Sequence, residues 1–353
     1  MTQAHLQRIG TAVPDHDIHQ SFIDFASEML HDPRAQSIFQ RLVAKSDIRH
    51  RYSCLHNGGS GAGFALDAHT FYADGHFPST AERMRVFELA APTLARRALD
   101  RLALTAAERS RIGHVFVTCC TGFYAPGLDF DILNHLGLPG STERTMVGFM
   151  GCYAAINALK LARHYVRSQP ESSALVVNLE LCTLHFHESQ ELTEVLAFLL
   201  FGDGASAALI GSEPGGFAMD GFEALKLEDS ADLITWRIGD MGFDMFLSTH
   251  VPSRIARAMR ENATAISANE KVDLWAVHPG GRAVLDAVEE GLALDADALK
   301  ASRCVLSRFG NMSSATVMFV LEQMMREASS GQRGCALSFG PGVTAEMMRF
   351  HVA

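Results

Sequence analysis

The stretch Glu143-Arg-Thr-Met-Val-Gly-Phe-Met-Gly-Cys152-Tyr-Ala-Ala-Ile-Asn157 decides how the first half of this chain folds. Its apolar, strand-like part ends at Gly151, and the alanine-rich part that follows predicts a helix over 152–167. A thiol at a helix N-terminus faces unpaired backbone N–H groups and the positive end of the helix dipole, which favour the thiolate. Because the thiolate is the nucleophilic form, Cys152 is a candidate acyl acceptor. The alternative is a small buried apolar side chain, the usual state of a free cysteine.

The composition is ordinary for a soluble globular protein. Hydrophobic residues make up 48% of the 353 residues and charged residues 20%, and this length suggests two domains or one large duplicated unit. The formal net charge of −10 argues against a nucleic-acid partner. This net charge does not exclude a local basic patch that binds a phosphorylated ligand.

The seven cysteines show no metal-binding or disulfide pattern. They stand at positions 54, 119, 120, 152, 182, 304 and 335, without a CxxC pair, and such an irregular set fits a reducing cytosol. The first residues lack the apolar stretch of a signal peptide, and the longest apolar run, Val195 to Phe201, is too short to cross a bilayer. We therefore expect a cytoplasmic protein that does not span a membrane.

Helical and strand-like segments alternate along the chain, which predicts an α/β architecture. Helices are expected over 21–44 with a break at Pro33, over 82–104, 152–167 and 313–327, and from 252 and 283; strands are expected over 114–120, 174–179, 205–210, 273–277 and 334–339. The turn-rich stretch 211–216 is the best boundary. We expect one half over 1–214, with Cys152, and a second over 215–353.

Two polar residues of the second half also stand at glycine-marked turns. His278 ends a strand before Pro-Gly-Gly281, where an imidazole suits a base or a hydrogen-bond donor; a core imidazole bonded to backbone is the alternative. Asn311 precedes a helix, which its side chain could cap, or its amide could donate to an oxyanion. Papain-like proteases share the order Cys, His, Asn, but their nucleophile lies in a different flanking sequence from Gly-Cys152-Tyr-Ala-Ala-Ile.

Five motifs together resemble the bacterial type III polyketide synthases of the chalcone synthase superfamily. In family order they are Gly151-Cys152-Tyr-Ala-Ala, Phe201-Gly-Asp-Gly-Ala205, Val277-His278-Pro-Gly-Gly281, Gly310-Asn311-Met-Ser-Ser-Ala315 and Phe339-Gly-Pro-Gly342, within a resemblance that runs from Phe39 to the C-terminus. β-Ketoacyl carrier-protein synthases III typically have His-Gln-Ala-Asn in place of His278-Pro-Gly-Gly, and thiolases lack the Asn311 type of motif. The resemblance implies a thiolase-like, layered αβαβα fold of two similar halves, a homodimer, and no metal or redox cofactor.

The resemblance also implies the chemistry. Cys152 would accept an acyl starter from coenzyme A (CoA), and His278 would stabilise its thiolate. His278 and Asn311 would stabilise the enolate formed when malonyl-CoA loses carbon dioxide, and repeated condensation would end in a cyclised polyketide. One alternative is a single-condensation ketosynthase fed by an acyl carrier protein. The other is a catalytically inactive homologue that only binds partners.

Further site residues follow from the same resemblance. The implied cavity residues are Phe201, Cys182, His185, Ala197, Trp236, Met245, Ser313, Gly340 and Pro341. Arg41 and Lys45 fall on positions that contact CoA phosphates in plant relatives. Because a third such position is Ile38, Arg49 and Arg51 are candidates to replace it.

The cavity departs from that of chalcone synthase. Cys182 and His185 replace threonines, Ala197 and Trp236 replace glycines, and Met245 replaces a gatekeeper phenylalanine. A blocked aromatic slot with an apolar lining predicts unbranched aliphatic starters instead of an aromatic one. The expected products are alkylpyrones or alkylresorcinols.

Overall fold

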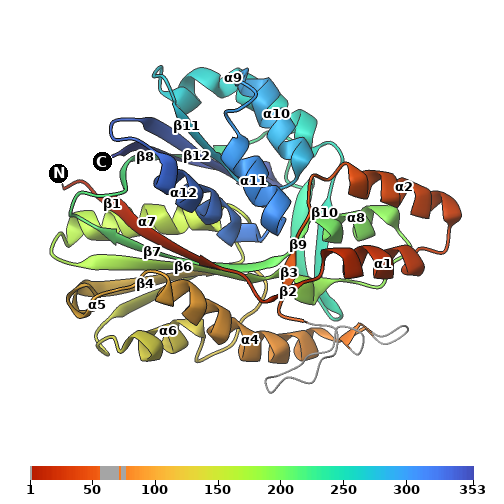
Figure 1. Cartoon of the computed structure of the whole chain (residues 1–353), viewed down its shortest axis with the longest axis horizontal. Helices are drawn as coiled ribbons and strands as arrows, with labels where there is room; N and C mark the ends of the chain where they lie inside the picture. Colours follow the sequence, from red (N-terminus) through yellow and green to blue (C-terminus); the bar gives the residue numbers. More distant parts are fainter. Residues whose placement is uncertain (1, 56–70, 73–76) are drawn as a thin grey trace.

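The computed structural model describes residues 2–55, 71–72 and 77–353, and its centre is one nine-stranded mixed sheet in two parts (Figure 1). The first part contains β1 (His5–Ala12), β7 (Asp203–Gly211), β6 (Ser173–Leu181), β4 (Ile112–Cys119) and β5 (Glu143–Gly148), in that spatial order. The second contains β8 (Phe217–Lys226), β13 (Thr344–Val352), β12 (Arg333–Gly340) and β11 (Leu274–Val277). The parts join where His5 and Leu6 of β1 pair with Ala218 and Phe217 of β8.

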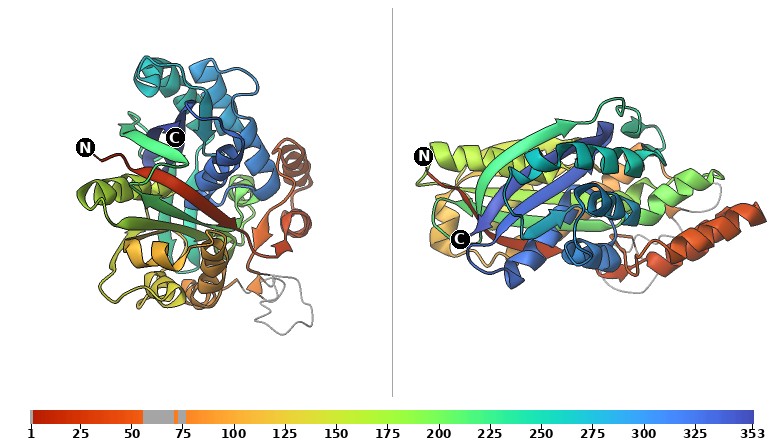
Figure 2. Two further views of the ribbon diagram at one scale, coloured as in Figure 1. Left: turned by 60° about the vertical axis from the view of Figure 1, so that its left-hand side comes forward. Right: turned by 90° about the horizontal axis from the view of Figure 1, so that it is seen from above.

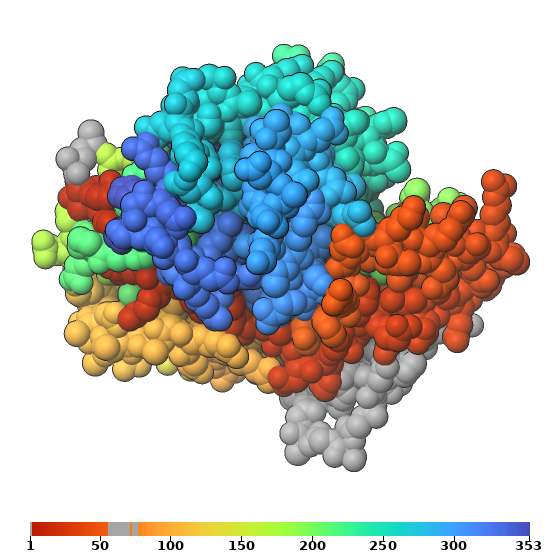
Figure 3. Space-filling view, turned by 45° about the horizontal axis from the view of Figure 1, so that its top comes forward, coloured from red at the N-terminus to blue at the C-terminus, as the bar shows by residue number. Residues whose placement is uncertain are grey.

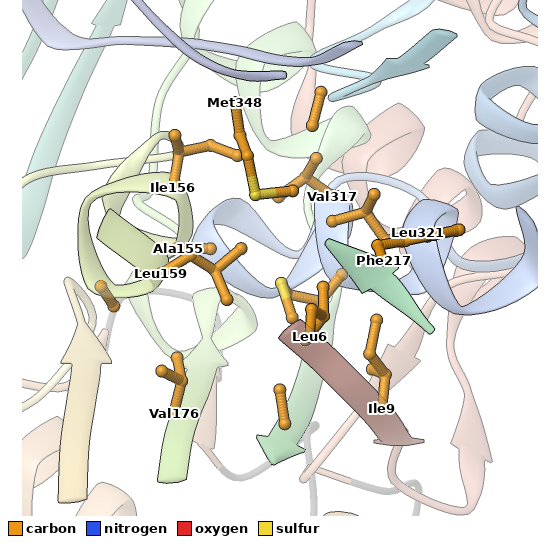
Figure 4. Packing of buried hydrophobic residues seen from close by; sticks show 14 of the residues in the cluster. Leu6, Ile9, Ala155, Ile156, Leu159, Val176, Phe217, Val317, Leu321 and Met348 are labelled. Atoms are coloured by element: carbon orange, nitrogen blue, oxygen red, sulfur yellow. The ribbon is translucent and has the colours of Figure 1, made fainter. Parts of the chain in front are cut away.

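Two helices, α7 (Ala154–Ser168) and α12 (Thr316–Glu327), lie between the two parts of the sheet. The buried residues of both helices are apolar apart from Thr316, and both helices contact strands of each part of the sheet. Figure 4 shows the resulting core, in which Ile156 of α7 and Val317 of α12 belong to one buried cluster with Val176 of β6 and Met348 of β13. This cluster fixes the distance between the two layers of sheet.

Outer helices complete the layers. On the first part of the sheet lie α4 (Thr80–Asp100), α5 (Ala106–Arg111) and α6 (Leu128–Leu136); on the second lie α9 (Val251–Ser267) and α10 (Arg282–Leu292), with α11 (Lys300–Phe309) beside α10 and α12 (Figure 2). The order helix, sheet, helix, sheet, helix confirms the thiolase-like αβαβα fold. Within the described ranges, no helix combines the length and apolar composition needed to cross a membrane.

The remaining elements gather at one end of the molecule. They are α1 (His19–Met29), α2 (Pro33–Ala44), the 3₁₀ turn η1 (Cys182–His185), α8 (Leu192–Leu200), the hairpin β9 (Ile234–Gly239) with β10 (Gly242–Leu247), and the short pair β2 (His16–Asp17) with β3 (Tyr52–Ser53). Helices α1 and α2 project from the body as a lobe, red and orange in Figure 3. The 3₁₀ turns η2 (Ser313–Ala315) and η3 (Pro341–Val343) lie next to the sheet ends.

Most expected elements agree with the structure to within a few residues. The break at Pro33 is confirmed, because α1 ends at Met29 and Pro33 is the first residue of α2, whose N-cap is Asp32. The long helix expected over 82–104 begins at Thr80, where Ser79 and Glu82 form a capping box, and ends at Asp100. The turn after β7 lies where the boundary was placed; a division into 1–214 and 215–353 stays a prediction.

Candidate active site

The three polar residues from the glycine-marked turns meet in one cavity. Cys152, His278 and Asn311 all line it, and it encloses about 820 Å³ of space, part of it open to solvent. Seven of the expected cavity residues line it with them: Phe201, Cys182, Trp236, Met245, Ser313, Gly340 and Pro341. The cavity therefore draws on both halves of the chain, which explains why no single segment of sequence defines it.

Cys152 lies in the turn that leads into α7. Gly151 has φ +85°, and a Cβ at this position would lie 2.2 Å from Cδ of Pro341, so only glycine fits there. Helix α7 itself begins at Ala154, with Tyr153 as its N-cap, and not at Cys152 as the sequence pattern indicated. The Sγ atom of Cys152 donates a weak hydrogen bond of 3.6 Å to Oγ of Ser313.

The resting state of Cys152 differs from the sequence-based expectation. Burial raises the pKa of its thiol to about 11, against the lowering effect of hydrogen bonds from Ser313 and Asn311. We expected the helix N-terminus to favour the thiolate. Loss of hydration outweighs that effect, because the sulfur is enclosed and stands two residues before the helix starts. The thiol is therefore neutral at pH 7 unless a neighbour takes its proton.

His278 directly follows β11 (Leu274–Val277), and its side chain is bonded to none of the residues that the structure describes. Its backbone N–H donates to the carbonyl of Leu337 at 2.8 Å, but neither ring nitrogen finds a partner in the part of the chain that the structure describes. The side chain is buried, and burial lowers its pKa to about 3, so the imidazole is neutral at pH 7. A core histidine of the alternative kind would have at least one ring nitrogen hydrogen-bonded to the backbone. An unpaired buried imidazole on a cavity wall indicates that a bound molecule supplies its partner.

Asn311 is held in one orientation by both ends of its amide. Oδ1 accepts hydrogen bonds from the Ser313 backbone N–H at 2.8 Å and from Oγ1 of Thr316 at 3.4 Å. Nδ2 donates to the Gly280 carbonyl at 3.3 Å, and the same amide faces the Cys152 sulfur, whose pKa it lowers. Asn311 thus caps the turn that follows it and also presents an amide donor, so both readings of the sequence apply.

Phe201 is fixed through its backbone. The backbone N–H of Asn311 donates to the Leu200 carbonyl at 2.8 Å, and that of Gly202 donates to the Asn311 carbonyl at 3.0 Å. The Nη1 atom of Arg51 donates to the carbonyls of Phe198 and Phe201 at 2.9 and 2.7 Å. Arg51 is 1% exposed, which corrects the expectation that it contacts a CoA phosphate. Its guanidinium anchors the end of α8 instead.

The other basic candidates lie on the surface near the end of α2. Arg41 occupies the last turn of α2, Lys45 caps it, and Arg49 follows in the loop, all three exposed. Arg282, at the start of α10, reaches the same region, with Nη1 3.5 Å from the Lys45 carbonyl. The position of Arg282 could not be predicted from the sequence, because no local pattern indicates that α10 begins beside α2. Phosphate binding by these residues stays a prediction.

Two expected cavity residues lie outside its lining. His185 is fully buried; its Nε2 donates to the Thr121 carbonyl at 2.7 Å and its Nδ1 accepts from the Phe243 N–H at 3.2 Å. Its ring stacks on Phe243 with a centroid distance of 4.1 Å, and burial lowers its pKa to about 3. Ala197 is buried on α8, away from the lining. Both are corrections, and His185 is a structural tie between η1 and β10.

A buried carboxyl group that the sequence analysis did not assign lies beneath the nucleophile turn. Glu180 of β6 accepts hydrogen bonds from Oγ of Ser314 at 2.6 Å, from the Cys120 N–H at 3.0 Å and from Oγ1 of Thr121 at 2.8 Å. Burial raises the pKa of Glu180 to about 7, and its charge contributes to the raised pKa of Cys152. An acidic residue inside a largely apolar strand was the signal that could have revealed it.

The hairpin β9–β10 forms one wall of the cavity. Trp236 and Met245 are direct partners across the hairpin, and both line the cavity. The indole Nε1 of Trp236 donates to the Cys120 carbonyl at 2.8 Å, which fixes the ring against the end of β4. Trp236 and Met245, which replace a glycine and a phenylalanine of chalcone synthase, therefore both face the space in which a starter would lie.

Comparison with known proteins covers nearly all of this chain. The family profile "Chalcone and stilbene synthases, N-terminal domain" matches residues 1–214, and "Chalcone and stilbene synthases, C-terminal domain" matches residues 223–353. A Mycobacterium tuberculosis protein named "Alpha-pyrone synthesis polyketide synthase-like Pks18" is 35% identical over 375 residues, which span 99% of this chain and 92% of that protein.

Solved structures with the same fold include two polyketide synthases. The crystal structure of PKS-I from the brown alga Ectocarpus siliculosus has a TM-score of 0.89 and 29% identity, covering 100% of this chain and 99% of that one. The C-terminal type III polyketide synthase domain of Steely1 from Dictyostelium has a TM-score of 0.87 at 23% identity, covering 99% of each chain. At that identity, the second likeness establishes the fold alone.

Proposed function

The chain belongs to the chalcone and stilbene synthase family and is a type III polyketide synthase, an acyltransferase; from this premise we propose that it extends an acyl starter on Cys152 by repeated condensation with malonyl-CoA. The observation that carries the proposal is the buried His278 ring, which has no hydrogen-bond partner among the described residues and lines the same cavity as Cys152 and Asn311. A nucleophile, an imidazole that is open to a ligand and an amide donor beside the sulfur match what acyl transfer and decarboxylation require.

Each group has a defined task in the proposed cycle. Sγ of Cys152 attacks the carbonyl of the starter thioester. CoA leaves as a thiol, because its sulfur takes up the proton that Cys152 has lost. Malonyl-CoA then loses carbon dioxide, and the negative charge moves onto its thioester oxygen, which His278 and Asn311 stabilise by hydrogen bonds. The resulting carbanion attacks the carbonyl of the Cys152 thioester and expels the Cys152 thiolate, so the extended chain is carried by CoA. Transfer of that chain back to Cys152, with release of CoA, begins the next round. One well-placed donor of this kind is worth on the order of 10²–10³ in rate.

No cofactor enters this proposal, since acyl transfer, decarboxylation and carbon–carbon bond formation here involve no net redox change. The substrates are acyl-CoA and malonyl-CoA, whose phosphates we assign to Arg41, Lys45 and Arg49, with Arg282 beside them. A starter delivered by an acyl carrier protein is the alternative for loading. We propose a cytoplasmic location, where CoA thioesters are made and used.

Incubation with malonyl-CoA and a panel of acyl-CoAs tests the function. Mass spectrometry of the products should reveal triketides or tetraketides that have closed to alkylpyrones or alkylresorcinols. The name of the mycobacterial relative, an α-pyrone synthesis protein, favours the pyrone. A product carrying a single β-ketoacyl extension would indicate a single-condensation ketosynthase, and the absence of any decarboxylation would indicate an inactive homologue.

Replacing Trp236 with glycine should widen the range of starters. The wild type is expected to prefer hexanoyl- to dodecanoyl-CoA over coumaroyl-CoA, because the indole fills space beside Met245 in the cavity. In Trp236→Gly, kcat/KM for coumaroyl-CoA should rise on the order of tenfold relative to hexanoyl-CoA. Trp236→Phe is the matched control, since it keeps an aromatic ring in the cavity while it removes the hydrogen bond to the Cys120 carbonyl and part of the side-chain volume. Equal kcat/KM values for both starter classes in the wild type would contradict this preference.

We also propose that the enzyme is a homodimer joined along β5. This strand is one of the two edge strands of the sheet, and Met146 within it is 40% exposed, with Met150 and Phe123 nearby at 38% and 37%. An exposed apolar edge strand is a template for pairing with another chain. Sedimentation velocity should give a dimer for the wild type and a shift towards monomer for Met146→Glu. A wild-type monomer at micromolar concentration would contradict the proposal.

A further inference from the structure

Ser313 has an uncommon backbone conformation beside the nucleophile. Its φ is +45°, a left-handed value that residues other than glycine rarely adopt. Two contacts fix this conformation: the Ser313 N–H donates to Oδ1 of Asn311 at 2.8 Å, and Oγ1 of Thr316 lies 2.9 Å from the Ser313 carbonyl oxygen. Backbone strain of this kind persists only where the surrounding structure enforces it, and it is concentrated at active sites.

The serine side chain is not needed to form this turn. A turn that required only a positive φ would be formed at lower cost by glycine, which adopts the left-handed region freely. Ser313 instead carries a buried hydroxyl on the cavity wall. Its Oγ atom lies 3.6 Å from Sγ of Cys152, and it makes no other hydrogen bond to a residue that the structure describes. The strained turn therefore places one hydroxyl group against the reacting sulfur.

The titratable groups around Cys152 do not favour its thiolate at rest. They are Glu180 of β6, Cys120 after β4, Cys182 of η1, Tyr153 at the start of α7 and His278 after β11. The charge of Glu180 opposes a second negative charge, and burial keeps the two thiols and the phenol protonated and the imidazole neutral. Hydrogen bonds from Ser313 and Asn311 act in the other direction and lower the pKa of Cys152.

We propose that Ser313 is a further catalytic residue, whose hydroxyl stabilises the Cys152 thiolate each time that thiolate forms. The inference rests on the proposed function, and it adds a group that acts on the sulfur itself. At rest the thiol donates to Oγ of Ser313. When the Sγ–H bond breaks and its proton passes to the imidazole of His278, the Ser313 O–H bond stays intact and rotates to donate to the sulfur, because a hydroxyl can both accept and donate.

Ser313 and Asn311 have different tasks in the proposed cycle. The Asn311 amide is needed at the enolate oxygen during decarboxylation, when Cys152 carries an acyl group and has no charge. Condensation then expels Cys152 as a thiolate in every round. Ser313 has no task at the enolate, so its hydroxyl is available to donate to the departing sulfur. A donor placed where negative charge develops lowers the barrier of both the attack by Cys152 and its expulsion.

Ser313→Ala should displace the ionisation of Cys152. The hydroxyl stabilises the charged form of the sulfur, so its loss should raise the thiol pKa. The rate of alkylation of Cys152 by iodoacetamide should fall about tenfold at pH 7, and its pH profile should move upwards by on the order of one unit, the usual effect of one hydrogen bond to a charged group. Malonyl-CoA decarboxylation should fall much less than alkylation, because alanine keeps the backbone N–H that orients Asn311.

Ser313→Gly is the second variant, and it retains the turn if alanine does not. Glycine accepts the positive φ without strain and removes the same hydroxyl, so its alkylation profile should move as far as that of Ser313→Ala. Ser212→Ala is the matched control. It removes a hydroxyl from the turn after β7, where Oγ donates to the Pro170 carbonyl at 2.7 Å, and it should leave the profile of Cys152 unchanged.

Peptide mapping of the alkylated full-length enzyme ensures that the profile is that of Cys152. A wild-type profile in both Ser313 variants, in an enzyme whose wild type makes polyketides, would overturn the role of Ser313 and leave the proposed function standing. Decarboxylation that falls as far as alkylation in Ser313→Ala would show that Ser313 only holds the turn, and would also overturn the inference. A wild type that makes no polyketide from malonyl-CoA and acyl-CoAs would overturn the proposed function and this inference with it.

Discussion

Cys152→Ala is expected to abolish polyketide formation, lowering its rate by a factor on the order of 10⁴–10⁶, as loss of a covalent nucleophile does. The cavity holds two other thiols, Cys120 and Cys182, but burial raises the pKa of each well above its ordinary value. Sγ of Cys120 is moreover engaged by the Gly151 N–H at 2.9 Å. Neither is therefore expected to replace the lost sulfur.

Intact-mass spectrometry after incubation with an acyl-CoA measures the loading step separately. The intact wild-type protein should gain the mass of one acyl group, and peptide mapping should place that group on the peptide that contains Cys152. Cys152→Ala should gain none. Cys182→Ala serves as the control and should still load. The melting temperature of Cys152→Ala should stay close to that of the wild type, because the residue lies in a turn and donates only one weak hydrogen bond. An acyl group on Cys120 or Cys182 would mean that the nucleophile was misassigned.

The sequence indicated the turns that carry Cys152, His278 and Asn311, because each turn is marked by local backbone chemistry; the reacting role of these residues stays a proposal. Gly151 is required by a positive φ and by the approach of Pro341. His278 ends a strand before Pro-Gly-Gly, and Asn311 follows Gly310, whose φ is +67°. Such constraints act over a few residues, so they are visible without the fold. The alternation of strands and helices predicted an α/β architecture, whereas the layered αβαβα arrangement was implied by the family resemblance.

Side-chain environments could not be predicted in the same way. Arg51 and His185 have side chains typical of surface or cavity positions, yet each is buried because distant backbone carbonyls supply its partners. The neutral state of Cys152 depends on how fully the second half of the chain encloses the first. The role of Glu180 depends on Ser314, which is 134 residues away in sequence. These are properties of tertiary packing, and no local pattern encodes them.

Asn311→Ala should lower malonyl-CoA decarboxylation on the order of 10²–10³-fold, the usual effect of removing one oxyanion donor. Acylation of Cys152 should fall much less. Asn311→Asp is the informative partner, because its carboxylate can still accept from Ser313 and Thr316 but cannot donate. If donation is the role of Asn311, the aspartate variant should be as slow as the alanine variant. Near wild-type decarboxylation in Asn311→Asp would show that capping alone matters.

His278→Ala should slow decarboxylation to a similar degree and, in addition, move the alkylation of Cys152 to higher pH. Burial holds the pKa of the Cys152 thiol at about 11 and that of His278 at about 3, so both are neutral at rest. Transfer of the thiol proton to the free imidazole creates two opposite charges, whose attraction in a buried site offsets part of the cost of forming them. Without His278 the thiolate forms only as the pH approaches the raised thiol pKa.

The rate of alkylation by iodoacetamide between pH 6 and 10 measures this shift. His278→Gln separates the two roles of the imidazole, because an amide can donate to the enolate oxygen but cannot accept the thiol proton at neutral pH. It should retain more decarboxylation than His278→Ala while showing the same displaced alkylation profile. If both variants keep the wild-type profile, Cys152 and His278 do not form an ion pair, and His278 acts on the enolate alone.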